Sequence, residues 1–381
     1  MHTFSAIAGV VLVVIILLDA FETVVLPRRV SRQHFRPSVR FYRNTWRAWA
    51  RLAAHVSSPS RREAFLGYFG PLSLLALLGL WAAGLIFGFA LLQFGTGEHL
   101  QLSGEPITFG RLLYHSGETF FTLGYGDITP ISPASRLLAV LEAGMGFAFL
   151  GTVIGYLPTI YSAFSRREVE IARLDARAGS PPTAAELLRR FGSTQRQLAL
   201  DQILRDWEHW AAEVLESHLS YPVLLFYRSQ HNNQSWLGAL TAILDASALI
   251  VARVENFSPE QAKITFAMAR HAVVDLAQVV AARYSPLGTD RLPEEEFQRL
   301  RQALAEQGLK VRESPETAEK LAQLRSLYEP YVVAIARNLF ITLPPWIHPQ
   351  KMRDNWQGGP WDRLIQARGL GERQQAIDEH F

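Results

Sequence analysis

The feature that most constrains this chain is the distribution of charge along its first half. Residues 64–97 contain no charged side chain, residues 137–165 contain one, and residues 2–27 contain two. Each run exceeds the ~20 residues that a helix needs to cross the hydrocarbon core of a membrane. From about residue 166 onward the chain is charged and resembles a soluble protein. The sequence therefore predicts one half in lipid and one half in water.

Three spanning helices are expected, at about Phe4 to Leu26, Phe65 to Phe94 and Ser135 to Phe164. The first run could instead be a signal peptide. A signal peptide has a basic segment before the apolar run and small residues at its end. This run follows Met-His-Thr and ends in Asp19, Glu22 and a Pro-Arg-Arg sequence. The pattern favours an anchor helix that is not cleaved.

Charges beside these helices predict the orientation. Residues 28–62 hold ten arginines and no acid, which is typical of the cytoplasmic side of a membrane. The loop at residues 95–110 has two glutamates before Gly110 and no lysine or arginine, so it should face outside. We expect a multi-pass protein of a cell membrane with its N-terminus outside and residues 166–381 in the cytoplasm.

The basic linker at residues 28–64 carries arginines every three or four residues. A voltage-sensing helix would have apolar residues between its arginines and acidic partners on companion helices. An interfacial helix would instead mix arginine with aromatic residues and bind anionic lipid headgroups. The interleaved aromatic residues favour the interfacial helix. The arginines in register are Arg36, Arg40, Arg43, Arg47 and Arg51.

Composition excludes several classes of function. The chain has no cysteine, which removes disulfides, thiolate metal sites and cysteine nucleophiles. Its net charge of +3 is too small to argue for nucleic-acid binding. No catalytic triad or paired carboxylates stand out, so we predict no enzyme and no catalytic residue.

The segment between the second and third helices carries the most specific motif. Residues 109–121 are compatible with a helix but are too few to cross a bilayer twice, so the segment must enter the membrane and return. Non-helical backbone at membrane depth occurs only where it is buried in protein or lines a water-filled path. The run Thr122-Leu123-Gly124-Tyr125-Gly126-Asp127 follows at this point.

The residue types of this run suit a potassium-selective filter. In potassium channels, backbone carbonyls replace the hydration shell of K⁺. Gly124 and Gly126 can adopt positive φ without a Cβ penalty. Thr122 would add a hydroxyl at the inner mouth, and Leu123 and Tyr125 would contribute carbonyls. We expect these five residues to bind K⁺ as the permeant ion, with no other cofactor.

A single loop supplies one quarter of a fourfold ring. The chain has one such loop and no internal repeat. The sequence therefore predicts a homotetramer with cyclic symmetry.

From about Phe65 to Arg167 the chain resembles the pore domain of the prokaryotic two-helix potassium channels, and most of all the bacterial pH-gated type. The family's filter reads Thr-Val-Gly-Tyr-Gly-Asp, and Leu123 stands in the valine position. The resemblance implies an outer helix, a pore helix, a filter and an inner helix. It covers about a quarter of the chain.

The resemblance also implies support for the filter from two carboxylates. Glu118 stands nine residues before Asp127, and the matching residues of the pH-gated channels share a proton behind the filter. Alternatively, Glu118 accepts hydrogen bonds from backbone amides. Tyr114 and His115 replace the paired tryptophans of those channels, which puts their inactivation behaviour in doubt here.

The third helix carries candidate hinge and gate residues. Gly146 stands in the position of the family's inner-helix hinge, although a membrane glycine can equally serve close helix packing. Pro158 cannot donate its backbone hydrogen bond and should kink the helix. Tyr156, Pro158 and Ile160 lie near the expected convergence of four inner helices and are gate candidates.

Three acids lie within the membrane runs. Glu142 should face protein or water because a charge in lipid is costly. It either bonds to the back of the pore helix or stays protonated. Asp19 and Glu22 share a helix face and are expected to pair with arginines at the inner interface, with proton sensing as the alternative.

The second half should be helical, with proline-rich breaks and few strand signals. Two apolar stripes predict helices: Leu198 to Val214, and Ile264 through Met268 and Val274 to Val279. The half lacks the Gly-x-Gly-x-x-Gly turn of a dinucleotide-binding domain. It could bind an unknown cytoplasmic ligand.

Two polar features of the second half have competing interpretations. Residues 227–234 form a dense polar run, which is either a capped interhelical turn or a contact loop. His271 and Asp275 are spaced like metal ligands, but two ligands are too few for a site, so a buried hydrogen-bonded pair is expected.

The sequence thus predicts an all-α membrane protein with four parts. They are an N-terminal transmembrane helix (1–27), a basic interfacial helix (28–64), a tetrameric potassium-channel pore domain (65–165) and a helical regulatory domain (166–381). A non-selective or sodium-conducting channel, and a membrane-anchored sensor or scaffold with a vestigial pore, are the alternatives.

Overall fold

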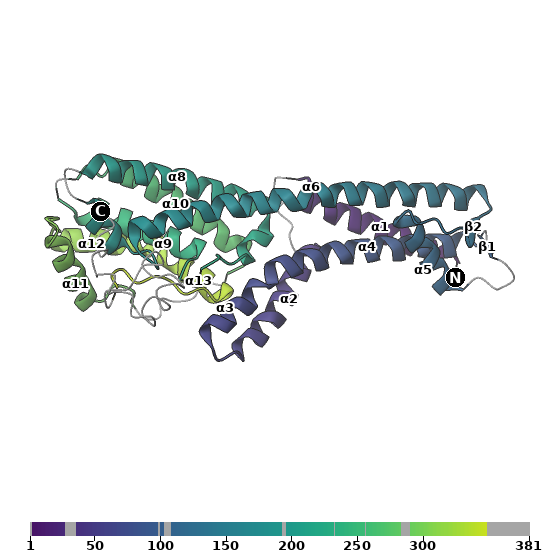
Figure 1. The fold of residues 1–381 in the computed structure, drawn as a ribbon, viewed down its shortest axis with the longest axis horizontal. Helices are drawn as coiled ribbons and strands as arrows, with labels where there is room; N and C mark the ends of the chain where they lie inside the picture. The colour runs from purple at the N-terminus through teal and green to yellow at the C-terminus, as the bar shows by residue number, and fades with distance from the viewer. Residues whose placement is uncertain are drawn as a thin grey trace, which may run out of the picture. The chain divides into compact units, whose positions relative to one another are not determined.

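The structure is a computed structural model that describes residues 2–26, 36–97, 100–102, 108–192, 196–231, 233–255, 257–282 and 290–348. These residues form an almost entirely helical protein (Figure 1). The chain divides into two compact units, Met1–Ser162 and Ala163–Phe381. The last helix of the first unit continues into the second. The two units are described separately.

The first unit contains the helices expected in the membrane. Three elements are long and apolar enough to span a bilayer: α1, the α3–α4 stretch and α6. Helix α6 is 46 residues long, and its residues 163–178 belong to the second unit. The elements are α1 (His2–Val24), α2 (Pro37–Ala54), α3 (Pro59–Gly67), α4 (Phe69–Thr96), β1 (Leu100–Leu102), α5 (Phe109–Phe120), β2 (Ile128–Pro130) and α6 (Pro133–Ala178).

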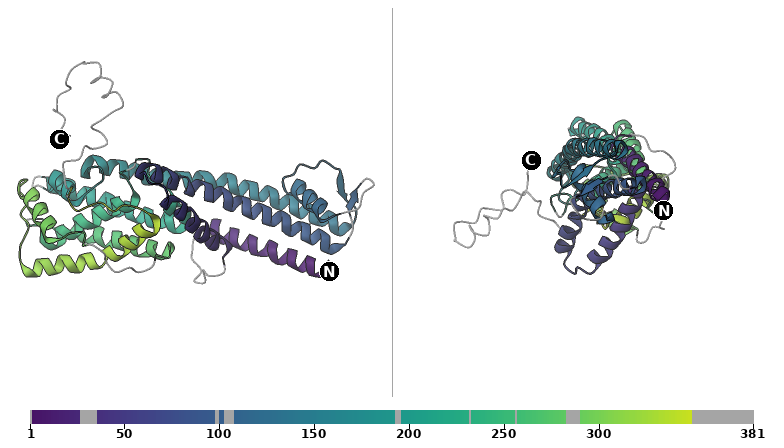
Figure 2. Two further views of the ribbon diagram at one scale, coloured as in Figure 1. Left: turned by 90° about the horizontal axis from the view of Figure 1, so that it is seen from below. Right: turned by 90° about the vertical axis from the view of Figure 1, so that its right-hand side faces the viewer.

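Helix α1 packs along α4, as Figures 1 and 2 show. Small residues allow the two backbones to approach closely. A Cβ atom added to Gly9 would lie 2.7 Å from the carbonyl oxygen of Gly88, and one added to Gly95 would lie 2.4 Å from the backbone nitrogen of Ala6. Glycine contacts of this kind are the usual means of helix association in membranes. The additional first helix therefore packs along α4 of the same chain.

The basic linker forms two helices, α2 and α3, rather than one. Each begins with proline at its first turn, where the missing N–H has no helical partner to lose. Trp46 packs edge-on against Phe69 with ring centroids 4.8 Å apart, and Trp49 stacks on Phe65 at 4.6 Å. Arg36 precedes α2, and three other arginines of the linker lie outside the described residues.

A short antiparallel sheet closes the re-entrant segment. Leu100 of β1 pairs with Pro130 of β2, and Leu102 pairs with Ile128. The side chain of Ile128 is buried with Ala90 and Leu112. This pairing ties the chain after the motif to the chain that follows α4. The two loop acids that suggested an outward face lie outside the described residues.

The second unit is a bundle around one buried helix. Helix α9 packs against α7, α8, α10, α12 and α13. It is long and apolar enough to span a membrane, but 94% of its most apolar window is buried within the protein. An all-round apolar helix covered in this way is a core helix. The elements are α7 (Ala184–Phe191), α8 (Gln197–Ser220), the 3₁₀ helix η3 (Pro222–Phe226), α9 (Trp236–Arg253), α10 (Glu260–Val279), α11 (Glu294–Ala305), α12 (Pro315–Ser326) and α13 (Glu329–Leu339).

A buried ionic cluster surrounds Asp245 of α9. The carboxylate of Asp245 accepts hydrogen bonds from Arg291 at 2.7 and 3.1 Å and from the hydroxyl of Tyr328 at 2.5 Å. Glu329 lies 3.2 Å from Arg291 and 3.1 Å from Arg325. A buried carboxylate needs such partners, and their presence agrees with α9 being packed in protein.

The helix predicted from Ile264 to Val279 is confirmed as part of α10, which buries a face that includes Phe266, Ala269 and Val273 and leaves Ile264 53% exposed. One expectation for the second unit is wrong. His271 and Asp275 form a pair at 3.8 Å, but the His271 side chain is 61% exposed, so the pair is not buried. Alanines form much of the buried face of α10.

Candidate functional site

Helix α5 brings the motif to its position. It has 12 residues, or ~18 Å of helix, which is too short to cross a bilayer. Its C-terminal Phe120 is buried in the core formed by α1 and α4. The backbone N–H groups of Thr122 and Leu123 donate to the carbonyls of Thr119 (3.0 Å) and Glu118 (2.8 Å). The first motif residues are thus fixed to the end of α5.

The backbone of the motif alternates in the sign of φ. Thr122, Gly124 and Gly126 have φ values of +56°, +63° and +80°, whereas Leu123 and Tyr125 are not in the positive-φ region. In an ordinary extended strand successive carbonyls point to opposite sides. Alternation between the two hands turns them toward one side. Glycine adopts the left-handed region freely, and Thr122 is held there against its preference.

Glu118 takes two partners behind the motif. Its Oε1 lies 3.0 Å from His115 Nδ1, and its Oε2 accepts a 3.3 Å hydrogen bond from the backbone N–H of Tyr125. His115 and Glu118 are both buried. The backbone-amide alternative for Glu118 is therefore the arrangement in one subunit, with His115 as an additional partner.

Asp127 has a different partner. Its Oδ1 accepts a 3.1 Å hydrogen bond from the N–H of Ile128. The expected shared proton between Glu118 and Asp127 stays a prediction.

Gly146 is a point of close packing. A Cβ atom there would lie 1.8 Å from the carbonyl oxygen of Phe120 and 2.7 Å from its carbonyl carbon. Its neighbours Gly144 and Gly151 have no atom within 4 Å of an added Cβ. Helix α6 therefore passes against the end of α5 at Gly146. The hinge role of Gly146 stays a prediction.

Helix α6 continues unbroken through Pro158 (Figure 1). The hydroxyl of Thr159 donates to the carbonyl of Gly155 at 2.9 Å. Tyr156 and Ile160 are buried, whereas Pro158 lies on the exposed face of α6. Of the three gate candidates, only Pro158 is exposed in a single subunit.

Glu142 is fully buried between three helices. Its Oε1 contacts the hydroxyl of Ser116 on α5, and the same hydroxyl lies 2.7 Å from the carbonyl oxygen of Ile86 on α4. Glu142 therefore bonds to the back of α5, which is one of the two arrangements expected from its position.

Asp19 joins α1, α2 and α4. Its carboxylate accepts from the backbone N–H of Ser38 (3.1 Å), the Ser38 hydroxyl (2.8 Å) and the indole N–H of Trp81 (2.9 Å). Arg36 Nε lies 3.8 Å from Asp19 and 3.0 Å from Glu22. Both acids thus face an arginine, and Asp19 also accepts an N–H at the start of α2, where a helix favours negative charge.

The polar run at residues 227–234 binds the part of α6 in the second unit. Arg167 is buried and donates to the carbonyls of Leu224 and Tyr227, each at 2.9 Å. Ser229 donates to Glu168 at 3.2 Å. His218 lies 3.1 Å from Arg167, and burial together with that charge holds the pKa of His218 well below its usual value. The run is therefore an interhelical connection that also contacts α6.

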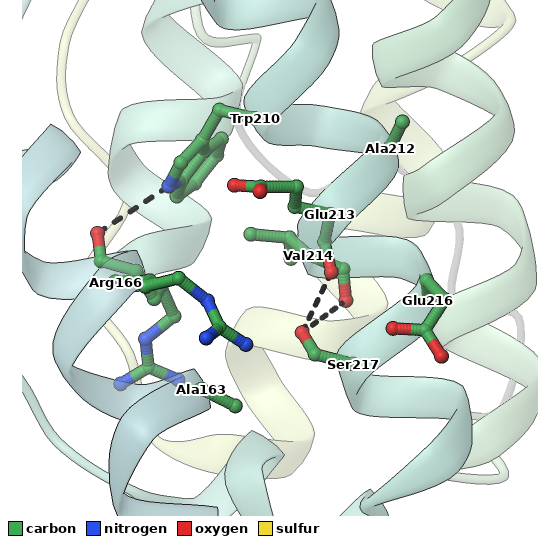
Figure 3. A pocket seen from close by; sticks show the side chains of 9 residues that line it. Ala163, Arg166, Trp210, Ala212, Glu213, Val214, Glu216 and Ser217 are labelled. Carbon is green, nitrogen blue, oxygen red and sulfur yellow. Dashed lines mark hydrogen bonds between the residues drawn. The ribbon is translucent and has the colours of Figure 1, made fainter.

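A cavity of about 320 Å³ lies beside this cluster, between α6 and α8 (Figure 3). Arg166 and Arg167 line it, but so do Glu213 and Glu216. The acids offset the arginines, so the cavity lacks the single-sign field that an anionic ligand such as a nucleotide phosphate needs.

Comparison with known proteins decides the class of the first unit. Residues 76–162 match the model of a family described as "Ion channel". The match begins within α4, includes α5 and the motif, and ends where the first unit ends. The protein carries an ion channel domain.

A likeness to another protein extends beyond the channel domain. An uncharacterized membrane protein of Bacillus subtilis (strain 168), YdjJ, is 24% identical over 241 residues, which cover 62% of this chain and 69% of that protein. This alignment is longer than the whole channel domain. No solved structure matches the chain.

Sequence reasoning missed two residues of this site. His115 was noted only as a replacement, although its position three residues before Glu118 places the two on one helix face. Ser116 gave no signal, because its partners lie 26 and 30 residues away along the chain. The family match and the helical fold point to a channel rather than to an enzyme.

Proposed function

We propose that this protein is the subunit of a potassium-selective channel and that Thr122, Leu123, Gly124, Tyr125 and Gly126 form its filter. The observation that carries the proposal is the alternating sign of φ along these residues at the end of α5. Alternation of this kind turns successive carbonyls to one side, and carbonyls replace the hydration shell of K⁺ in potassium channels. Glu118 and Asp127 support the filter from behind.

Four copies complete the site, because one chain supplies only one filter strand. The side chain of Tyr125 is 69% exposed in a single subunit. The α6 side chains Phe147, Leu150, Ile154 and Tyr161 form an exposed apolar stripe. In a tetramer, exposed apolar side chains of this kind would contact neighbouring subunits or line the inner vestibule. The functional unit is therefore a homotetramer with α6 as its inner helix.

Gating is by the inner helices. Helix α6 carries Gly146 against the end of α5, then Pro158, and then the residues that the second unit binds through Arg167. A rearrangement of the second unit thus acts directly on the helix that borders the filter. In this arrangement the N-terminus is outside the cell and the second unit is in the cytoplasm.

The experiment that tests the function is ion flux from liposomes. Purified protein is reconstituted into vesicles loaded with K⁺, and the flux is compared with that from vesicles loaded with Na⁺. A potassium channel releases K⁺ and retains Na⁺, and cross-linking of the same sample yields a tetramer. Equal release of both ions would favour a non-selective channel, and absence of release would favour a sensor or scaffold.

The exposed face of α2 is the surface for anionic membrane lipid. Arg43, Arg47 and Arg51 recur at intervals of four residues and are all exposed, whereas Trp46 and Ala50 face the protein. A helix of this composition next to a spanning helix attracts acidic headgroups by ~1 kcal/mol per arginine.

Replacing Arg43, Arg47 and Arg51 by glutamine is expected to weaken binding of phosphatidylglycerol about fivefold per arginine. Native mass spectrometry of the detergent-solubilised protein, titrated with that lipid, measures the effect. Arg299→Gln on α11 is the matched control, because Arg299 is a half-exposed surface arginine of the second unit. Unchanged lipid affinity in the triple variant would show that this face of α2 does not bind anionic lipid.

A further inference from the structure

If the carboxyl group of Glu142 were ionised, its contacts would contain too few hydrogen-bond donors for the acceptors present. The Ser116 hydroxyl lies between two oxygens, Oε1 of Glu142 and the carbonyl oxygen of Ile86. A hydroxyl has one hydrogen to donate. The Ile86 carbonyl can only accept, so at 2.7 Å it takes the Ser116 hydrogen. The contact with Glu142 then needs a hydrogen from Glu142 itself.

The surroundings of Glu142 also oppose a charge. The residue is 0% exposed, and its Oε2 has no hydrogen-bond partner. No salt bridge reaches it within the described part of the chain. Helix α4 brings no charged residue, and on α5 the titratable groups on either side of Ser116 in the sequence, His115 and Glu118, contact each other. The acid of α1, Asp19, is bonded to Ser38 and Trp81. An ionised carboxylate without partners at this depth would be very costly.

We infer that Glu142 is held protonated and acts as a positioning residue for the filter. Its O–H donates to Ser116, and Ser116 donates to Ile86, so one proton chain joins the inner helix, the pore helix and the outer helix. The inference rests on the proposed channel function. Glu142 itself does not touch the ion path.

The route from this chain to the filter is short. Ser116 lies two residues before Glu118, whose carboxylate accepts the N–H of Tyr125 and whose carbonyl accepts the N–H of Leu123. Movement of α5 against α4 and α6 would shift both hydrogen bonds. Loss of the Glu142 proton leaves the single hydrogen of Ser116 for two acceptors, the Glu142 carboxylate and the Ile86 carbonyl. One of the two contacts is then lost, which loosens α5 from α6 or from α4.

The test compares Glu142→Gln with the parent protein in K⁺-loaded liposomes at neutral and alkaline pH. Glutamine keeps the size of the neutral acid and an N–H donor, but it cannot ionise. The parent should lose K⁺ flux about tenfold at alkaline pH, as expected for one unsatisfied buried partner, whereas Glu142→Gln should change less than about twofold. Glu22→Gln, which alters an acid beside Arg36, should keep the alkaline loss of the parent.

A second measurement does not depend on conduction. The infrared band of a protonated carboxyl C=O should be present in the parent at neutral pH and lost in Glu142→Gln. An unchanged band, an equal alkaline loss in both proteins, or failure of Glu142→Gln to form the oligomer of the parent would each overturn the inference. A parent protein that shows the band but does not select K⁺ would instead contradict the proposed function.

Discussion

Gly126→Ala is expected to abolish selective K⁺ flux while the protein still assembles. Gly126 has φ of +80°, and an added Cβ would meet no atom within 4 Å in the subunit. The substitution therefore acts on backbone conformation rather than through a clash. Alanine resists this region by ~1–2 kcal/mol, and four subunits bear the strain together. The carbonyls of the proposed filter would turn away from the axis.

Gly144→Ala provides the control for that substitution. Gly144 has helical φ, and an added Cβ there meets no atom within 4 Å in the same chain. Alanine there carries no backbone penalty, because alanine is favoured over glycine in a helix, and flux should stay within about twofold of the parent. The measurement is liposome flux, with the oligomer monitored by size-exclusion chromatography. Selective flux retained in Gly126→Ala would show that residues 122–126 do not form the filter.

Gly146→Ala is expected to disrupt the channel domain itself. The added Cβ would lie 1.8 Å from a backbone oxygen of Phe120, and a backbone atom cannot be displaced by rotation of a side chain. Helices α5 and α6 must separate, at a cost near the upper end of the roughly 1–3 kcal/mol typical of overpacking. We expect loss of most of the folded oligomer and a lower unfolding temperature of what remains.

The hinge interpretation makes a different prediction for the same variant. A hinge glycine replaced by alanine would leave assembly intact and alter only opening. Gly151→Ala on the same helix, where an added Cβ meets no atom within 4 Å, is the matched control and should assemble normally. A Gly146→Ala tetramer as stable as the control would contradict the packing role and favour the hinge.

The spanning helices could be predicted because they depend on composition. Lipid excludes charge, so long runs without charge mark the segments that became α1, α4 and the first part of α6. The sequence did not indicate that α6 continues to Ala178, because Arg166 and Arg167 resemble the end of a membrane helix. Arg167 is instead buried, and its guanidinium donates to the backbone carbonyls of Leu224 and Tyr227. These partners lie 57 and 60 residues away in the chain.

The alternating backbone was predictable at Gly124 and Gly126 from residue type. Positive φ at Thr122 was not, because a β-branched residue rarely adopts this region. The same limit applies to Glu142. Its position predicted contact with the pore helix, but only the structure identifies Ser116 and the carbonyl of Ile86 as its neighbours.

The second unit was the least predictable part. The stripe from Leu198 to Val214 correctly predicted a helix, α8, although Leu198 itself is 82% exposed near the helix start. On α10 the large apolar residues do not mark the buried face of the helix, because alanines form much of that face. Side-chain size alone therefore does not identify the buried face of a helix in a tightly packed bundle.

The most direct test of the account is the reversal potential of the purified protein in a planar bilayer with K⁺ on one side and Na⁺ on the other. A ring of carbonyls from Thr122 to Gly126 predicts a reversal potential displaced strongly in the direction set by K⁺, and loss of the current in Gly126→Ala. A current that reverses near zero under these ions would contradict the potassium filter.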